Sequence, residues 1–249
     1  MHRFFLPPEC FREQEVTFPT SVARQMSSVL RLHPGQRVIA IDRQGFEHEV
    51  ELLKIERGTA YGRAHSSRMV ASEPHTRLTL YLCLTQREKF EGMLQKGTEL
   101  GAYAFVPVIS SRSLVQHQDE PSKKHERWQR IVQEAAEQSG RGRVPVVHPT
   151  QPFETALQQA SQENDRLLIP WEREQQTDLH QVLVSAPGEP IAAQTMRVAV
   201  VIGPEGGFST EEIAFAEQAG FQSITLGPRI LRMETAAIVI TALVLYELG

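Results

Sequence analysis

The chain has 249 residues, 41% of them hydrophobic and 22% charged, so it can bury a sizeable core as one large domain or as two unequal ones. Two cysteines, at positions 10 and 83, are too few and too far apart for a disulfide framework or a zinc site, and no spacing of histidines indicates another metal. The net charge of -4 is uneven, because the first 143 residues carry 21 basic and 17 acidic side chains while the last 106 carry 5 and 13.

The low cysteine content and the absence of a long apolar segment predict a cytoplasmic protein. The apolar stretch at the N-terminus is too short for a secretory signal. The longest apolar run, residues 236–246 with one threonine, is 11 residues long, whereas a bilayer takes about 20. The excess of basic side chains in the first part is compatible with binding of a polyanion there, so nucleic acid stays open as a partner.

The N-terminal third of the chain predicts a small β-rich module, expected to be a barrel. Residues 37–42 and 46–55 alternate well enough for a β-hairpin with Arg43-Gln44-Gly45 as its turn, and residues 60–64 predict a further strand. A polar stretch at 72–75, which includes Pro74, marks the end of the module.

After this boundary the pattern changes to strands that alternate with helices. In the helix 89–100 the apolar face includes Leu100 and the stop signal is Gly101; in another, Ser209 and Glu212 form a capping box and Gly220 is the stop. Such alternation predicts a mostly parallel sheet with helices on both faces. The expected strands are 78–84, 105–109, 144–147, 167–169, 197–202 and 224–226, and the expected helices are 89–100, 123–139, 153–160, 178–184, 210–219 and 235–248.

Two segments of this second part have the residues of a ligand-binding turn. Residues 202–208 (Ile-Gly-Pro-Glu-Gly-Gly-Phe) and 231–237 (Leu-Arg-Met-Glu-Thr-Ala-Ala) each follow an apolar strand and open a helix. Neither contains the Gly-x-Gly-x-x-Gly or P-loop pattern. A turn built largely from main chain suits the polar edge of an adenine better than a triphosphate, although the same residues also suit a simple strand-to-helix connection.

Four blocks of the sequence, in this order, resemble the RsmE family. They are Lys89 with residues 96–101 (Lys-Gly-Thr-Glu-Leu-Gly), residues 134–145, residues 202–209 and residues 226–236. Members of that family are bacterial methyltransferases that modify N3 of a uridine in 16S ribosomal RNA. The resemblance implies a SPOUT-type α/β fold with a mostly parallel sheet and a C-terminal trefoil knot at 74–249, after a PUA-like β-barrel that binds RNA at 1–73.

The resemblance also implies a cofactor, S-adenosylmethionine, and an assembly, a homodimer that acts on 16S rRNA in the 30S subunit. Three loops would hold the cofactor, at the end of one strand and in the two turns. The cofactor-binding residues that this predicts are Leu168, Ile169, Pro170, Gly203, Pro204, Glu205, Gly206, Leu226, Gly227, Ile230, Leu231, Met233, Thr235 and Ala236.

The chemistry of this reaction suggests the catalytic residues. A uridine imide N–H is a poor nucleophile until its proton leaves, and a guanidinium, which keeps its own proton, favours the resulting anion. We therefore predict that Arg232 binds the uracil oxygen and that Glu234 or Glu205 accepts the proton. Two other interpretations stay open: Arg232 forms an ion pair that locks the turn, and Glu234 only stabilises the start of the last helix.

For RNA, the predicted contacts are Arg3, Arg24 and Arg31 in the small domain and Arg141 and Arg143 in a glycine-spaced loop. Lys96 and Glu99 are three residues apart on a predicted helix, and this spacing is as compatible with an ordinary surface ion pair as with a functional role. Two other functions compete with this hypothesis. One is a methyltransferase of the same fold that acts on transfer RNA or on another position, and the other is an RNA-binding protein without catalysis.

Overall fold

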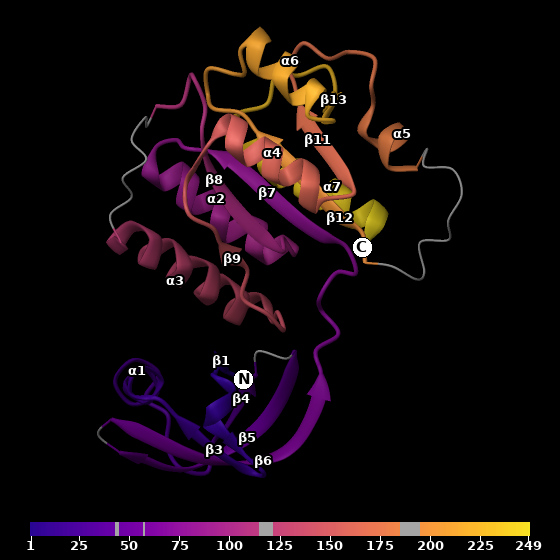
Figure 1. Cartoon of the computed structure of the whole chain (residues 1–249). Helices are drawn as coiled ribbons and strands as arrows, with labels where there is room; N and C mark the ends of the chain where they lie inside the picture. Colours follow the sequence, from indigo (N-terminus) through magenta and orange to yellow (C-terminus); the bar gives the residue numbers. More distant parts are fainter. Residues whose placement is uncertain (43–44, 57, 115–121, 185–194) are drawn as a thin grey trace. The chain divides into compact units, whose positions relative to one another are not determined.

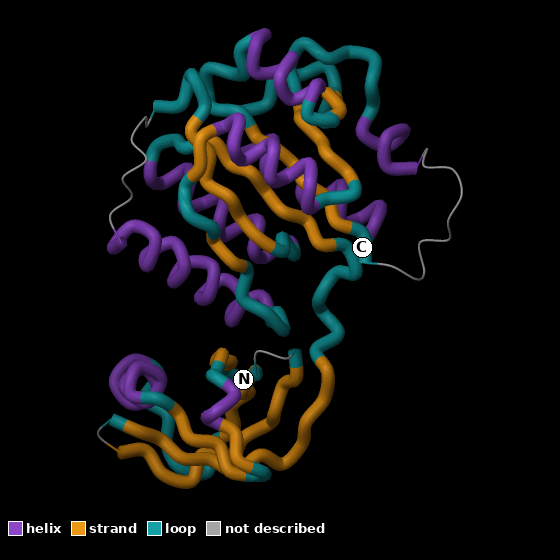
Figure 2. The backbone as a smooth tube through the Cα atoms, in the orientation of Figure 1, coloured by secondary structure: helices purple, strands orange, loops and turns teal. Residues whose placement is uncertain are grey.

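The computed structural model describes residues 1–42, 45–56, 58–114, 122–184 and 195–249, and its chain forms two compact units. The first contains residues 1–73 together with residues 136–144, and the second contains residues 74–135 and 145–249. Each unit has a sheet of its own (Figure 2). The division between Glu73 and Pro74 lies inside the polar stretch that marks the end of the β-rich module in the sequence.

The first unit is built on a curled six-stranded sheet in the order β1-β4-β5-β6-β3-β2. All of its pairings are antiparallel except the one between β1 and β4. The predicted hairpin is confirmed as β4 and β5, although Arg43 and Gln44 of its turn lie outside the described residues. The strands are β1 (Arg3–Phe5), β2 (Phe11–Arg12), β3 (Glu15–Phe18), β4 (Arg37–Ile41), β5 (Phe46–Glu56) and β6 (Thr59–Met69).

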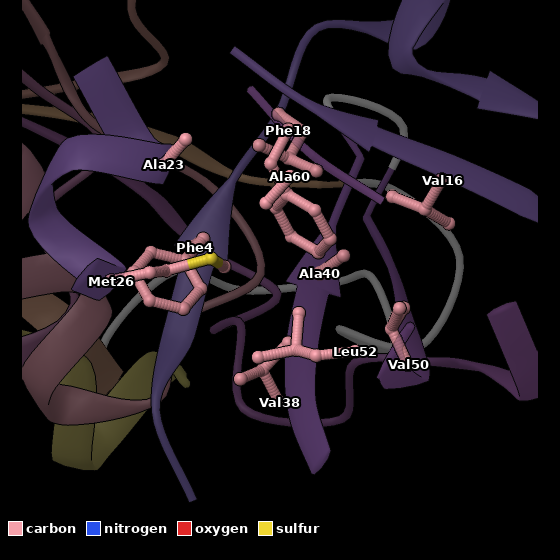
Figure 3. Close-up of a cluster of buried hydrophobic side chains, with 11 residues drawn as sticks. Phe4, Val16, Phe18, Ala23, Met26, Val38, Ala40, Val50, Leu52 and Ala60 are labelled. Atoms are coloured by element: carbon pink, nitrogen blue, oxygen red, sulfur yellow. The ribbon is translucent and has the colours of Figure 1, made fainter. Parts of the chain in front are cut away.

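Alternation along these strands builds one hydrophobic core (Figure 3). Every second residue of β3, Val16 and Phe18, points inward, and Phe4 of β1 meets Phe18 edge-on with ring centroids 6.3 Å apart. The helical segments add Ala23 from α1 (Thr20–Arg24) and Met26 from the π-helix η2 (Gln25–Val29). A short 3-10 helix, η1 (Pro8–Cys10), links β1 to β2.

Residues 136–144 belong to the first unit because they bind the end of its chain. The guanidinium of Arg141 donates to Glu73 with Nη2 and Oε2 2.7 Å apart, and the N–H of Gly142 donates to the same carboxylate at 2.8 Å. The hydroxyl of Ser72 donates to the carbonyl of Gly140 at 2.8 Å. Only 3% of the Arg141 side chain is exposed, so this ion pair is part of the interior of the unit.

The second unit is an α/β layer structure around a seven-stranded parallel sheet. Its strand order is β10-β8-β7-β12-β11-β13, and β9 also pairs with β8. β8 lies on one side of β7, with β9 and β10 paired to it. On the other side β12 lies between β7 and the earlier strand β11, and β13 is outermost, so the side on which strands are added changes between β7 and β12. The strands are β7 (Arg77–Cys83), β8 (Ala104–Ile109), β9 (Val146–Val147), β10 (Gln151–Pro152), β11 (Arg166–Pro170), β12 (Arg197–Ile202) and β13 (Gln222–Ile224).

Helices cover both faces of this sheet. On one face α2 packs against α7, and α4 and α6 lie together on the other (Figure 1). Within the described residues, no helix combines the length and apolarity of a membrane span. The helices are α2 (Arg87–Leu100), α3 (Ser122–Ser139), α4 (Phe153–Glu163), α5 (Leu179–Val184), α6 (Thr210–Gln218) and α7 (Met233–Leu248).

The predicted helix signals are largely confirmed. Helix α2 ends at Gly101, whose φ of 115° is left-handed, and α6 begins with the reciprocal capping box of Ser209 and Glu212. Two details differ. Leu100 is 37% exposed, because the last turn of α2 rotates it away from the core, and α7 begins at Met233, two residues earlier than expected.

Candidate functional site

One large pocket lies where strands β11, β12 and β13 end. Its volume is about 1010 Å³, which is ample for a nucleoside-sized ligand. The loop that follows each of these three strands forms part of the pocket wall, and α2 contributes Lys89. This is the carboxyl edge of a parallel sheet beside the reversal of strand order, the usual place for a ligand in such folds.

The turn after β12 presents a fixed carboxylate, that of Glu205. The hydroxyl of Thr85 donates to its Oε1, and the ammonium of Lys89 lies 3.1 Å from the same oxygen. Thr85 and Lys89 come from the segment after β7, so two neighbouring strands jointly fix this side chain.

These contacts determine the protonation state of Glu205. Burial by itself would raise its pKa, but the hydroxyl of Thr85, the backbone N–H of Glu205 and the ammonium of Lys89 together lower the pKa below its usual value. Glu205 is therefore ionised at neutral pH. A carboxylate that is already stabilised in this way is a weak proton acceptor.

The same turn requires glycine at position 207. Gly207 has a φ of 67°, and a Cβ built on it would lie 2.8 Å from Oε1 of Glu172. A side chain there would be strained and would displace Glu172, which also lines the pocket. The turn after β12 and the loop after β11 thus come close enough to share one wall.

The loop after β11 is held by hydrogen bonds to the end of β13 and within the loop itself. The N–H of Trp171 donates to the carbonyl of Ile224 at 3.0 Å, and the N–H of Glu174 donates to the carbonyl of Trp171 at 3.1 Å. The carboxylate of Glu174 accepts the N–H groups of Gln176 and Thr177, and these hydrogen bonds lower its pKa. Such a loop is ordered before any ligand arrives.

The segment after β13 exposes unused main-chain donors. Within the described residues, the N–H groups of Arg229, Ile230 and Leu231 meet no acceptor of the chain. Apolar side chains, among them Leu226 and Met233, complete the wall. Bare donors beside an apolar surface suit a flat heterocycle with a polar edge.

The start of α7 carries the two predicted catalytic side chains. Arg232 is the N-cap of this helix and is exposed, and among the described residues no ion pair or hydrogen bond holds its guanidinium. Glu234 is in the first turn, and its Oε2 is buried without a hydrogen-bond partner in the part of the chain that the structure describes. Both residues line the pocket, and the ion pair that would lock Arg232 to Glu205 or Glu234 is not formed.

Most of the predicted cofactor residues line this pocket. Three do not: Leu168 and Ile169 are buried in β11, where they form core, and Thr235 is exposed on α7. Leu168 and Ile169 precede the end of the strand, where only Pro170 reaches the pocket, and Thr235 is turned away by the helical rotation after Glu234. The predicted residues in the wall are Pro170, Gly203, Pro204, Glu205, Gly206, Leu226, Gly227, Ile230, Leu231, Met233 and Ala236.

Sequence reasoning missed the loop that follows Pro170. Trp171, Glu172, Glu174 and Gln175 all line the pocket, and so does Lys89, which had no role beyond its place in a family block. The signal available was position, because a loop directly after a strand of a parallel sheet is at the ligand-binding edge.

The predicted RNA contacts fall into two groups in the structure. Arg24 and Arg31 are exposed, and Arg31 has a left-handed φ of 52°. Arg3 and Arg141 are instead committed to ion pairs: Arg3 lies 2.6 Å from Glu47, and Arg141 is buried against Glu73. A buried guanidinium cannot reach a phosphate, so Arg141 is not available as an RNA contact.

Comparison with known proteins assigns the family. A family model described as an RNA methyltransferase domain matches residues 72–245. A ribosomal RNA small subunit methyltransferase E from Bacillus subtilis is 30% identical over 99% of this chain and 97% of its own length. The chain belongs to the ribosomal RNA small subunit methyltransferase E family. A relative of the same name from Synechocystis is 34% identical over 97% of this chain and 76% of its own length.

Solved structures of this methyltransferase family have the same fold. The methyltransferase E of Neisseria gonorrhoeae, crystallised with S-adenosylmethionine, has a TM-score of 0.84 and 33% identity, over 98% of this chain and 96% of its own. A putative methyltransferase of Legionella pneumophila, also in complex with that cofactor, has a TM-score of 0.84 and 28% identity over 97% of this chain and 96% of its own. The expected α/β methyltransferase fold is therefore confirmed, whereas the trefoil knot stays a prediction.

Proposed function

We propose that this protein transfers a methyl group from S-adenosylmethionine to N3 of a uridine in 16S ribosomal RNA, with the 30S subunit in the cytoplasm as its substrate. The named relatives support the cofactor and the class of RNA. The observation that carries the proposal is at the start of α7. There, within the part of the chain that the structure describes, a guanidinium without a partner and a buried carboxylate oxygen without a hydrogen bond belong to two residues that line the same pocket.

The pocket fits the proposed cofactor. When bound, S-adenosylmethionine supplies an electrophilic methyl group on a positively charged sulfur. The apolar side chains of Leu226 and Met233 would enclose its adenosine part, and the open N–H groups of residues 229–231 would meet its polar edge. The ionised carboxylate of Glu205 favours a cationic ligand over an anionic one.

Arg232 and Glu234, at the start of α7, would have different roles in the reaction with uridine. Arg232 has an exposed guanidinium to which no described residue is paired, so it is available to bind the uracil oxygen on which negative charge collects. Glu234 is the better candidate for the proton of N3, because its Oε2 accepts no hydrogen bond from the described residues, whereas Glu205 already accepts two. Glu205 then serves to hold the cofactor.

RNA binding is proposed for the exposed side of the first unit. Arg24 and Arg31 flank η2, and no ion pair among the described residues neutralises either one. Two uncompensated guanidinium groups so close in sequence are suited to phosphate contacts, which set orientation and make binding salt-dependent. Arg143, partly buried, has contacts of its own within the chain and contributes less to this surface.

A homodimer is proposed through α7. This helix is apolar all around, since it buries Ile240, Val244 and other side chains while Ile238, Leu243 and Tyr246 remain exposed. A helix with no polar face is stable in water only when a partner covers its second side. A second copy of the chain would bury the same face on both subunits.

The decisive experiment offers labelled S-adenosylmethionine with 30S subunits, naked 16S RNA and transfer RNA, and then maps the modified nucleotide. We expect label at N3 of one uridine in 16S RNA, most efficiently in 30S subunits. Label in transfer RNA or at another atom would show a different specificity on the same fold. No transfer to any of the three, with RNA binding retained, would show a binding protein without catalysis.

A further inference from the structure

Among the described residues of the pocket wall, two opposite charges lie side by side, those of Lys89 and Glu205. The ammonium of Lys89 donates to Oε1 of Glu205 at 3.1 Å. The Lys89 side chain is 33% exposed and that of Glu205 is 27% exposed, although they contact each other. The chain therefore leaves both side chains open to a ligand in the pocket.

Lys89 reaches the pocket with the end of its side chain. Helix α2 lies entirely within the described residues, and Lys89 is its one residue in the pocket wall, so the helix backbone is set back from the pocket. The contact with Glu205 uses one of the three N–H donors of the ammonium, and the other two meet no acceptor among the described residues. This ammonium can still bind an anionic group.

Glu205 also keeps capacity for a ligand. The donors of Thr85 and Lys89 both meet its Oε1, and no side chain among the described residues donates to its Oε2. Because Glu205 is ionised at neutral pH, this second oxygen can accept a charge-assisted hydrogen bond from a cationic group. The pocket wall thus offers one positive and one negative group, each with unused hydrogen-bonding capacity.

A ligand that matches both groups must carry both signs of charge close together. In an α-amino acid the ammonium and the carboxylate are bonded to one carbon, so that a nitrogen and an oxygen of the two groups lie about 3 Å apart. The ion pair of Lys89 and Glu205 has a similar separation, 3.1 Å. Placed head to tail beside it, a zwitterion puts each of its charges next to the opposite one.

The other charged residues of the wall do not provide this match. Arg229 and Arg232 are exposed, and no described residue forms an ion pair with either one. Glu172 and Glu234 form no ion pair with a described residue, and Glu174 accepts backbone N–H groups of its own loop. Each of these residues could bind one end of a zwitterion, but not both ends.

We propose that Lys89 and Glu205 bind the amino-acid end of S-adenosylmethionine, with the ammonium of Lys89 on its α-carboxylate and the carboxylate of Glu205 on its α-ammonium. This inference rests on the proposed function for the identity of the ligand, and it makes Lys89 a cofactor-binding residue. The hydroxyl of Thr85 holds Glu205 in place before the ligand enters, so that little ordering is required.

The first test is calorimetry with Lys89→Met, which removes the charge and keeps much of the side-chain length. We expect S-adenosylmethionine and S-adenosylhomocysteine to bind about 10-fold more weakly to the variant. Decarboxylated S-adenosylmethionine and 5′-methylthioadenosine lack the carboxylate, so the variant should bind them at least as tightly as the wild type does. An equal loss for all four compounds, or no loss for any, would overturn the proposal.

The reciprocal test uses Glu205→Gln. S-adenosylhomocysteine should bind about 10-fold more weakly to this variant, because the α-ammonium loses its anionic partner. The analogue of S-adenosylhomocysteine in which a hydroxyl replaces the α-amino group should lose little affinity. These two compounds carry no positive charge on sulfur, so the comparison isolates the ammonium. Equal losses for both would place Glu205 beside another part of the cofactor and contradict the assignment.

The control is Lys96→Met. Lys96 is on the same helix, its ammonium lies 2.9 Å from Glu99, and it does not line the pocket. This variant should bind all of the compounds as the wild type does. If the wild type binds neither S-adenosylmethionine nor S-adenosylhomocysteine, both this inference and the proposed function fail. A wild type that binds them, with a Lys89→Met variant that does not discriminate among the four compounds, overturns this inference alone.

A second measurement keeps the charge of Lys89, in case Lys89→Met does not fold. The chain has five lysines, so isotope-labelled reductive methylation, which preserves the charge, gives five lysine signals in a carbon-proton correlation spectrum, and Lys89→Arg assigns the one of interest. S-adenosylhomocysteine should shift the Lys89 signal, whereas 5′-methylthioadenosine should leave it in place. A signal that shifts equally with both compounds, or with neither, would contradict the contact with the carboxylate.

Discussion

The ammonium of Lys89 lies 3.1 Å from the Oε1 of Glu205, and the hydroxyl of Thr85 donates to that same oxygen. A carboxylate between two such donors keeps its charge and its position. This separates the two acidic residues of the pocket that the sequence left as equal candidates for the base: Glu205 is satisfied, and Glu234 retains a buried oxygen with no partner in the described residues.

The first prediction concerns the pH dependence that follows from Glu205. Its pKa is lower in the folded protein than in the unfolded chain, so its interactions stabilise the fold above the unfolded-state pKa, and this contribution is lost as the pH falls through the folded-state value. The difference in free energy of unfolding between wild type and Glu205→Gln should be constant near neutrality and shrink in acid. Urea unfolding across this pH range measures it. Thr85→Val should reduce the same difference, and a difference that is independent of pH would contradict the assignment.

The second prediction tests the closeness of two pocket loops. Gly207→Ala forces a side chain into a left-handed conformation, which costs about 1–2 kcal/mol, and pushes Glu172 out of the pocket wall. We expect a lower free energy of unfolding and weaker binding of S-adenosylmethionine. Gly206→Ala is the control for stability, since a Cβ there meets Arg112 at 3.4 Å, an ordinary contact. Equal destabilisation by the two substitutions would argue against a special role for Gly207.

The elements of the second unit were predictable because their signals are local. The strand 197–202 has the expected bounds, and the capping box at Ser209 places the start of α6. The site could be predicted only in part. Each of its two turns is one continuous stretch of sequence. The partners of Glu205, Thr85 and Lys89, are 120 and 116 residues away along the chain, and no local pattern connects them to Glu205.

Burial that depends on distant residues also explains why some predicted RNA and cofactor contacts are inside the protein instead. Arg141 is in a glycine-spaced loop that looks exposed, yet Glu73, 68 residues earlier, neutralises it inside the first unit. Leu168 and Ile169 are close to the pocket in sequence but face the core, because only the end of a parallel strand reaches the ligand-binding edge.

The third prediction follows from that buried ion pair. Arg141→Ala leaves the Glu73 carboxylate without its guanidinium, so we expect a loss of about 1–3 kcal/mol in the free energy of unfolding. Urea unfolding checks this, and RNA affinity of the folded variant should change little. Arg31→Ala should do the reverse: it should leave stability nearly unchanged, weaken RNA binding and lower its salt dependence by about one ion. A large loss of RNA affinity in folded Arg141→Ala would reinstate it as a contact.

The fourth prediction concerns the guanidinium at the N-cap of α7. Arg232→Ala should retain the fold and the affinity for S-adenosylmethionine, because its side chain makes no ion pair or hydrogen bond among the described residues. Methyl transfer should fall about 10²–10³-fold, as expected when a donor to a developing anion is removed. Calorimetry and a single-turnover assay separate the two effects. Arg173→Ala, an exposed arginine that does not line the pocket, is the matched control, and a collapse of cofactor affinity in Arg232→Ala would identify that residue as structural.

The fifth prediction tests the homodimer proposed through α7. Tyr246 is 84% exposed on this helix, and Ile238 and Ala242 precede it at intervals of four residues, which places the three on one face. Tyr246→Glu introduces a charge that would be buried without a partner in a dimer and solvated in a monomer. We expect sedimentation equilibrium to give twice the 28.1 kDa chain mass for the wild type and a mixture dominated by monomer for the variant. Tyr61→Glu, on an exposed tyrosine of β6, should remain dimeric. A wild type that is monomeric at micromolar concentration would remove α7 as an interface and leave its apolar face to another partner.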